Sequence, residues 1–124
     1  MNKIPVLILI YNRPASTKKL LKKLSKIKPK KIFISSDGPK NKLDKLLCNK
    51  TKKVIKEINW TCSIKKNFFK KNYGCKEAVS RGLNWFFNYN NLGIILEDDC
   101  IPNKDFFVFC KKMLTYYKSN KNIG

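Results

Sequence analysis

Three consecutive acidic residues, Glu97, Asp98 and Asp99, form the part of the sequence best suited to chemistry. Eight acidic residues placed at random over 124 positions would give about 0.03 such triplets. Adjacent carboxylates repel one another by about 1 kcal/mol per pair in water, and by several times that in a drier site. The triplet therefore favours a bound cation, and carboxylate oxygens suit Mg²⁺ or Mn²⁺. The alternative is a solvated acidic turn whose charges meet some of the many lysines.

Two further polar residues also follow short apolar segments. Asp37 follows the segment 31–35 after one intervening serine, in the run Ser-Ser-Asp-Gly. Its carboxylate could accept a hydrogen bond from a ligand, or it could be an ordinary turn residue before glycine. Arg13 follows the apolar run Ile4–Ile10, and it could bind a phosphate or a base or simply lie in a surface loop. The residue types alone leave both pairs of alternatives open.

The spacing of apolar residues predicts strands and helices in alternation. Apolar runs predict buried strands at 4–10 and 93–96. Shorter strands are expected at 31–35 and 61–65. Helical spacing predicts helices from a cap at Ser16 or Thr17 to Pro29, then at 43–58, 75–87 and 106–117. In the second of these helices, the predicted apolar positions are Leu43, Leu46, Leu47, Val54, Ile55 and Ile58.

This alternation predicts an α/β fold with a mostly parallel, doubly wound, Rossmann-like sheet flanked by helices, in one domain. Open sheets of this kind bind ligands at the carboxyl ends of their strands. Arg13, Asp37 and the acidic triplet are all expected at that edge of the sheet.

Composition narrows the classes of function. The net charge of +20, from 28 basic and 8 acidic residues, suits attraction to phosphates, anionic lipid or nucleic acid. Lysines spread along the whole chain are equally what a lysine-rich composition places on solvated helix faces. The sequence carries no RNP-like aromatic signature and no zinc-finger spacing, so we do not expect nucleic acid as the main partner.

The absence of histidine from the sequence excludes His/Cys zinc sites and Cys–His or Ser–His catalytic pairs. Five cysteines without a C-x-x-C pair indicate reduced thiols. The apolar run near the N-terminus is too short for a membrane span. We therefore expect a soluble, cytoplasmic protein, with peripheral contact with the anionic inner face of a membrane as a further expectation.

Four segments, in order, resemble the bacterial nucleotide-diphospho-sugar glycosyltransferases of GT-A fold. They are PVLILIYNRP, IFISSDGPKN, NYGCKEAVSRGLNWFF and GIILEDDCIPNKDFFVFCKKML, and together they span nearly the whole chain. The same places are similar to the eukaryotic N-acetylglucosaminyltransferase that initiates complex N-glycans. The acidic triplet followed by a proline and a Phe-Phe pair is the most specific of these features.

The resemblance implies an enzyme that transfers a sugar from a nucleotide-diphosphate sugar, a UDP-sugar first, to a glycan or lipid-linked acceptor. Arg13 would lie near the base or the diphosphate, and Asp37 would accept a hydrogen bond from the pyrimidine ring N–H. Glu97 would approach the donor sugar, and Asp98 the ribose or the sugar. Asp99 would hold Mn²⁺ or Mg²⁺, as in a DXD-like motif.

The resemblance covers only the donor-binding part of such an enzyme. Residues 1–124 would be a C-terminally truncated GT-A domain, with the catalytic base beyond Gly124, and we expect no useful rate of transfer by this chain alone. Two alternatives remain. One is a non-catalytic module that binds a nucleotide sugar or an acidic polymer. The other is a nucleotidyltransferase, although the loop 11–14 lacks the glycine-rich signature of those enzymes.

Overall fold

The computed structural model describes residues 3–98. Asp99, Gly124 and the helix predicted at 106–117 lie outside the described residues. The elements, in order, are β1 (Val6–Ile10), α1 (Pro14–Leu24), β2 (Lys31–Ser36), α2 (Lys42–Val54), the 3-10 helix η1 (Ile55–Glu57), β3 (Ser63–Phe68), α3 (Cys75–Tyr89) and β4 (Ile94–Glu97).

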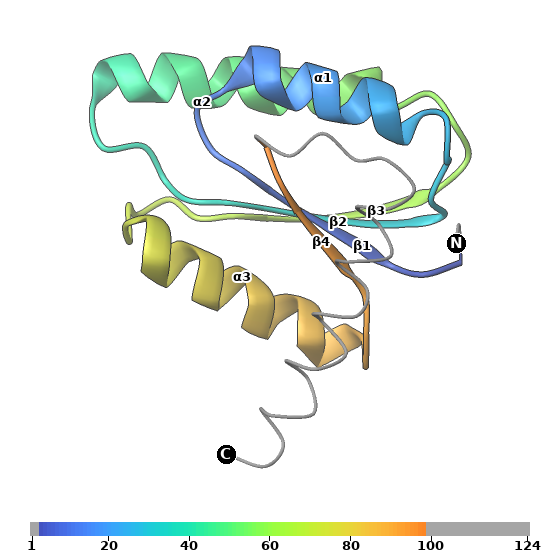
Figure 1. Cartoon of the computed structure of the whole chain (residues 1–124). Coiled ribbons are helices and arrows are strands. Elements are labelled where there is room, and N and C mark those ends of the chain that lie inside the picture. The colour runs from blue at the N-terminus through green and yellow to red at the C-terminus, as the bar shows by residue number, and fades with distance from the viewer. Residues whose placement is uncertain (1–2, 99–124) are drawn as a thin grey trace.

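The four strands form one parallel sheet in the order β3-β2-β1-β4. Helices α1 and α2 lie side by side on one face, and α3 covers the other (Figure 1). The predicted α/β class, with a parallel sheet between helices, is confirmed. The chain first builds outward from β1 to β3 and then returns through α3 to place β4 on the other side of β1. The winding direction therefore changes between β1 and β4, where open α/β sheets bind ligands.

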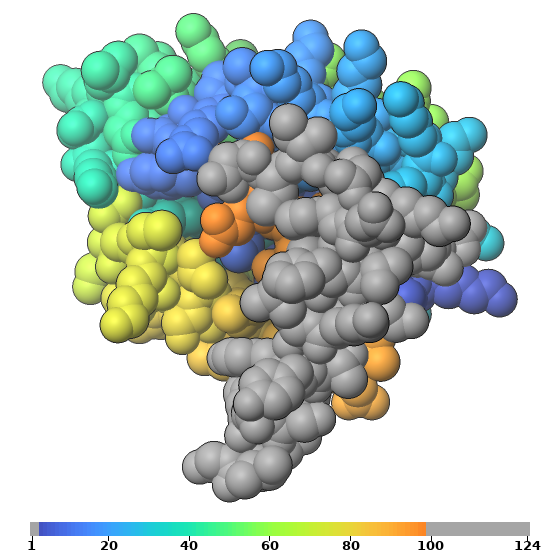
Figure 2. Space-filling model, viewed as in Figure 1, coloured from blue at the N-terminus to red at the C-terminus, as the bar shows by residue number. Residues whose placement is uncertain are grey.

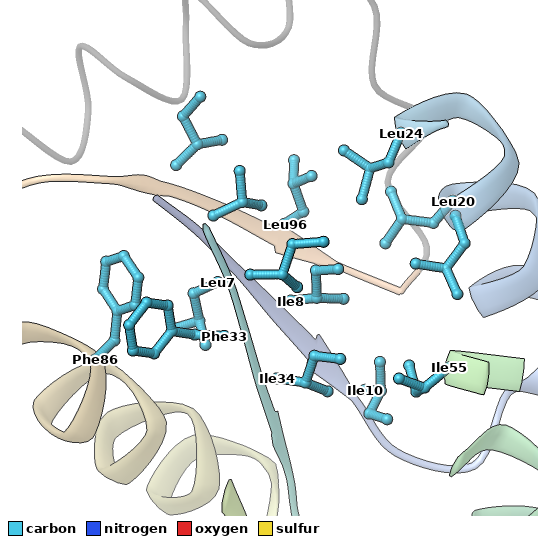
Figure 3. Packing of buried hydrophobic residues seen from close by; sticks show 14 of the residues in the cluster. Leu7, Ile8, Ile10, Leu20, Leu24, Phe33, Ile34, Ile55, Phe86 and Leu96 are labelled. Carbon is cyan, nitrogen blue, oxygen red and sulfur yellow. The ribbon is translucent and has the colours of Figure 1, made fainter. Parts of the chain in front are cut away.

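The core fills both faces of the sheet. Strand β1 is buried almost throughout because helices cover both of its sides. On the α3 side, the rings of Phe33 and Phe86 meet edge to face, with centroids 5.1 Å apart. On the opposite side, Ile8, Ile10 and Ile34 of the strands face α1 and η1 (Figure 3). Those helices contribute Leu20, Leu24 and Ile55 to the same cluster.

Two helix boundaries differ from the prediction. Helix α1 begins at Pro14 with Arg13 as its N-cap, rather than at Ser16 or Thr17. Proline suits the first turn because its missing N–H would have no partner there in any case. The same helix ends at Leu24, before Pro29 is reached. Strand β3 is also displaced along the chain, since its pairing with β2 runs from Ser63 to Phe68 instead of from 61 to 65.

The prediction for the apolar face of α2 was wrong at two positions. Leu43 and Leu46 are exposed to 70% and 60%, whereas Asp44, Cys48 and Thr51 are buried. Asp44 turns inward because it binds the loop after β1, as described below, and this rotates the two leucines toward solvent. Within residues 3–98, no helix has both the length and the apolar character needed to cross a bilayer.

Candidate functional site

A cleft of about 220 Å³ lies at the carboxyl edge of the sheet. Its walls come from the ends of β1 and β4 and from the first turns of α3. Ser35, near the end of β2, and Asp37, just after that strand, also line it. Figure 2 shows atoms from the end of β4, in orange, at the surface between the blue α1 segment and the yellow α3 segment. The cleft therefore sits at the change of winding between β1 and β4.

Arg13, Glu97 and Asp98 all line this cleft. Strands β1 and β4 pair in parallel, with Leu9 opposite Glu97, so the residues after each strand emerge at the same edge. Arg13 Nη1 lies 3.9 Å from Asp98 Oδ1, and the two side chains are 58% and 12% exposed. The structure thus brings together the basic and acidic residues that the sequence places 85 positions apart.

Asp37 lines the cleft as well, but its carboxylate is already engaged by the chain itself. The residue is 7% exposed. Oδ1 accepts hydrogen bonds from the backbone N–H groups of Gly38 and Tyr73, both at 2.8 Å. Oδ2 accepts from the backbone N–H of Gly74 at 3.0 Å and from Asn72 Nδ2 at 3.2 Å. A carboxylate has about four acceptor positions, so Asp37 holds the loop 72–74 in place.

The loop that Asp37 holds is packed closely and has a special backbone. A side chain at position 38 would put its Cβ 2.5 Å from the carbonyl oxygen of Lys71, so only glycine fits there. Gly74 caps α3 with φ 90° and ψ 156°, a conformation that side chains of L-residues rarely adopt. These constraints fix where α3 starts, and its first turns line the cleft through Cys75, Ala78 and Val79.

Asp44 is a site-organising residue that sequence reasoning missed. Its carboxylate accepts hydrogen bonds from the Tyr11 hydroxyl, from Asn12 Nδ2 at 2.7 Å and from the backbone N–H of Lys40 at 2.9 Å. Burial raises the pKa of Asp44, but these hydrogen bonds outweigh it and hold the pKa below its usual value. Burial, followed by the hydrogen bond to Asp44, raises the pKa of Tyr11 above its ordinary range.

Asn72 joins the two carboxylate clusters. Its Nδ2 donates to Gly38 O at 2.6 Å, to the Tyr11 hydroxyl at 3.1 Å and to Asp37 Oδ2 at 3.2 Å. Tyr11 in turn donates to Asp44. One polar network therefore connects the loops that follow β1, β2 and β3, and several of its members line the cleft.

One local signal in the sequence does point to Asp44, although only in part. Asn41 caps α2, and its side-chain oxygen accepts from the backbone N–H of Asp44 at 2.9 Å. An Asn followed three residues later by an acid is a helix-start pattern. The pattern marks the start of the helix, but it says nothing about Tyr11 and Asn12, which come from 32 and more residues earlier in the chain.

The described part of the chain does not by itself form a metal site. Across residues 3–98, no group of three His, Cys, Asp or Glu side chains is placed to hold a metal ion. Glu97 and Asp98 supply two carboxylates at the cleft, and Asp99 lies outside the described residues. The metal prediction for Asp99 therefore stays a prediction.

Searches of protein-family models, of curated proteins and of solved structures gave no match to this chain.

Proposed function

We propose that this chain is the donor-binding part of a glycosyltransferase that transfers a sugar from a nucleotide-diphosphate sugar, a UDP-sugar first, to a glycan or lipid-linked acceptor. The supporting observation is the meeting of Arg13, Glu97 and Asp98 in one cleft at the change of winding between β1 and β4. This is the place where parallel α/β sheets bind nucleotides. Because one fold can host many functions, the proposal rests on the chemistry of these residues and not on the fold alone.

The size of the cleft sets which part of the ligand it would take. Pockets for drug-sized ligands measure roughly 300–1,000 Å³, and this cleft measures about 220 Å³. In this proposal the cleft therefore takes only part of the nucleotide, and the sugar would extend past the end of β4. Glu97, which is exposed at that end, is the residue best placed to approach the sugar.

The residues divide into two tasks in this proposal. Arg13 would pair with a phosphate, and its partly exposed guanidinium can turn away from Asp98 to do so. Asp37 and Asp44 keep the surrounding loops in position through their hydrogen bonds. A divalent ion held with Asp99 would neutralise the diphosphate as it leaves. A hydrogen bond from the pyrimidine ring N–H to Asp37 is a separate hypothesis, because the ring N–H would have to replace one of the four donors that Asp37 already binds.

Titration calorimetry with UDP, with and without Mn²⁺, tests the proposal. The key variant is Arg13→Ala, which should weaken UDP binding about tenfold or more. Its effect on stability should stay below about 1 kcal/mol, because the ion pair is long and its arginine is 58% exposed.

Arg81→Ala is the matched control. Arg81 is a second exposed arginine, which pairs with Glu77 at 3.5 Å and lies outside the cleft lining. It should leave UDP affinity unchanged. Equal losses in the two variants would show that UDP responds only to net charge, and no binding of UDP by the wild-type chain with Mn²⁺ would remove the proposal.

A further inference from the structure

The lysines are unevenly distributed over the folded chain. Helices α1, α2 and η1, which form the layer on one face of the sheet, carry ten lysines and two acidic residues. One of these acids, Asp44, is buried, and the other, Glu57, lies 3.6 Å from Lys18. Helix α3, on the opposite face, carries one lysine, one arginine and one glutamate. Among the helices, the lysines therefore concentrate in the layer of α1, α2 and η1, and Figure 1 shows α1 and α2 on one face of the sheet, opposite α3.

Two large apolar side chains lie within this basic layer. Leu43 and Leu46 are exposed to 70% and 60%, and they stand three residues apart, on the same side of α2. Exposed lysines flank them on the same helix. We call Lys42, Leu43, Lys45, Leu46 and Lys50 the lysine–leucine face. A helix surface that serves only solubility would carry polar residues at the two leucine positions.

We propose that the lysine–leucine face docks on an anionic lipid bilayer. Lysines hold the chain near negative headgroups, and each one near the surface strengthens binding about fivefold. Leu43 and Leu46 can then enter the boundary between headgroups and acyl chains, as apolar residues of interfacial helices do. Lysine is a point charge without arginine's planar fork, so it suits a field of headgroups better than one specific phosphate.

A nucleic acid is a poorer partner for this face. The phosphates of a nucleic acid backbone would attract the lysines, but a nucleic acid has no apolar layer into which Leu43 and Leu46 could insert. An anionic bilayer offers charged headgroups to the lysines and an apolar layer to the leucines, and it is therefore the partner that the observations favour.

The position of the face adds a consequence for the cleft. Lys40 lines the cleft, and it lies just before Asn41, the cap residue of α2. The first turn of α2, which includes Leu43, therefore begins two residues after a residue that lines the cleft. Docking through this turn would bring the cleft close to the bilayer surface, where a lipid-linked acceptor would lie. That last step rests on the proposed transferase function, whereas the docking itself does not.

Co-sedimentation with vesicles, without nucleotide, tests the docking. The vesicles contain phosphatidylcholine alone, or with roughly 30% phosphatidylserine, in about 0.15 M salt. The wild-type chain should pellet with the anionic vesicles and stay in solution with the neutral ones. The pair Leu43→Ala and Leu46→Ala should weaken anionic binding about tenfold or more, while Leu92→Ala, which removes a 39%-exposed leucine elsewhere, should not.

A second pair of variants separates a defined face from net charge. Lys45→Glu with Lys50→Glu changes the face, and Lys30→Glu with Lys31→Glu makes the same charge change at the start of β2, outside the face. Loss of two lysines alone corresponds to about 25-fold weaker binding, so the first pair should fall by at least that factor and the second by much less. All the substituted residues are exposed, and thermal unfolding should match the wild type.

Three outcomes would overturn the docking proposal: no pelleting with anionic vesicles, equal losses in the two lysine pairs, or equal losses in the Leu43/Leu46 and Leu92 variants. Tighter binding to a homopolymeric RNA, independent of the two leucines, would assign the face to nucleic acid instead. The UDP calorimetry above is independent of these results. A chain that binds vesicles but not UDP would therefore keep the docking proposal and lose the transferase proposal, and the reverse result would do the opposite.

Discussion

Asp37→Ala offers the sharpest test of how the cleft is built. The substitution removes a buried carboxylate that accepts four hydrogen bonds. Two of its four donors keep another partner, because the Gly38 N–H also bonds to Lys71 O at 3.2 Å and Asn72 retains Gly38 O and the Tyr11 hydroxyl. The backbone N–H groups of Tyr73 and Gly74 have no second acceptor within residues 3–98. The cost of the substitution therefore comes mainly from these two donors.

The size of that cost can be estimated from the two orphaned groups. A buried donor without a partner costs about 1–3 kcal/mol, so Asp37→Ala should lower the free energy of unfolding by about 2–6 kcal/mol. That is a large share of the roughly 5–15 kcal/mol that stabilises an ordinary domain. Asp37→Asn should also lower the free energy of unfolding, because its carbonyl oxygen can still accept from Gly38 and Tyr73 but its Nδ2 group, a donor, would face the Gly74 N–H.

Urea unfolding followed by circular dichroism measures these values, provided that the slope of the transition is unchanged. Glu77→Ala is the control, since it also removes a carboxylate but from an exposed pair 3.5 Å from Arg81. It should cost less than about 1 kcal/mol.

Ligand binding by the Asp37 variants separates loop anchoring from base recognition. Asn72 and Cys75, at the two ends of the anchored loop, both line the cleft. A displaced loop should therefore weaken UDP and bare pyrophosphate by similar factors. If Asp37→Ala instead has the stability of the wild type and loses only UDP affinity, by about 1–3 kcal/mol, Asp37 reads the base and the anchoring argument is refuted.

Three further predictions concern the same edge of the sheet. The lowered pKa of Asp44 means that it adds stability above its unfolded pKa of about 4, and that this is lost as pH falls through the lower folded pKa. Asp44→Asn should therefore flatten the loss of stability below about pH 4, and an unchanged acid profile would contradict this. Gly74→Ala should cost about 1–3 kcal/mol through backbone strain alone, since its Cβ would meet nothing within 4 Å; a neutral effect in urea unfolding would show that the φ of 90° is not required. Burial, with the nearby Asp44 charge, raises the pKa of Cys48 to about 11, so peptide mapping after alkylation at neutral pH should find exposed Cys75 labelled before Cys48, and the reverse order would argue against this burial.

The fold was largely readable from the sequence because its signals are local. Continuous apolar runs mark strands covered on both sides, and lysines at helical spacing mark the outer faces of α1 and α2. The order of these elements then predicts a parallel sheet. Boundaries were less predictable, as at β3, because its ends are set by pairing with β2 and not by its own alternating sequence.

The candidate site was readable only where a strand end marks it. Arg13, Asp37 and Asp98 follow strands, so the topology brings them to one edge. Asp44 could not be found in this way, because its role depends on Tyr11 and Asn12 from a distant loop. The same long-range contact explains the error at Leu43, since helical periodicity gives the spacing of a buried face but not which polar residue a partner loop will draw inward.

The placement of the acidic residues carries a final consequence for any anionic ligand. Four of the six acids within residues 3–98 lie at the carboxyl edge of the sheet, and the hydrogen bonds described above already occupy Asp37 and Asp44. Glu97 and Asp98 also line the cleft, where Asp98 lies 3.9 Å from Arg13. A diphosphate charge about 5 Å from either carboxylate would be repelled by about 3 kcal/mol at an effective dielectric of about 20, and one exposed arginine offsets only part of this. Binding beside Glu97 and Asp98 should therefore depend on a divalent cation. If UDP binds equally well in the presence of a chelator, its phosphates must lie away from Glu97 and Asp98, and Lys40 is then the candidate partner among the residues that line the cleft.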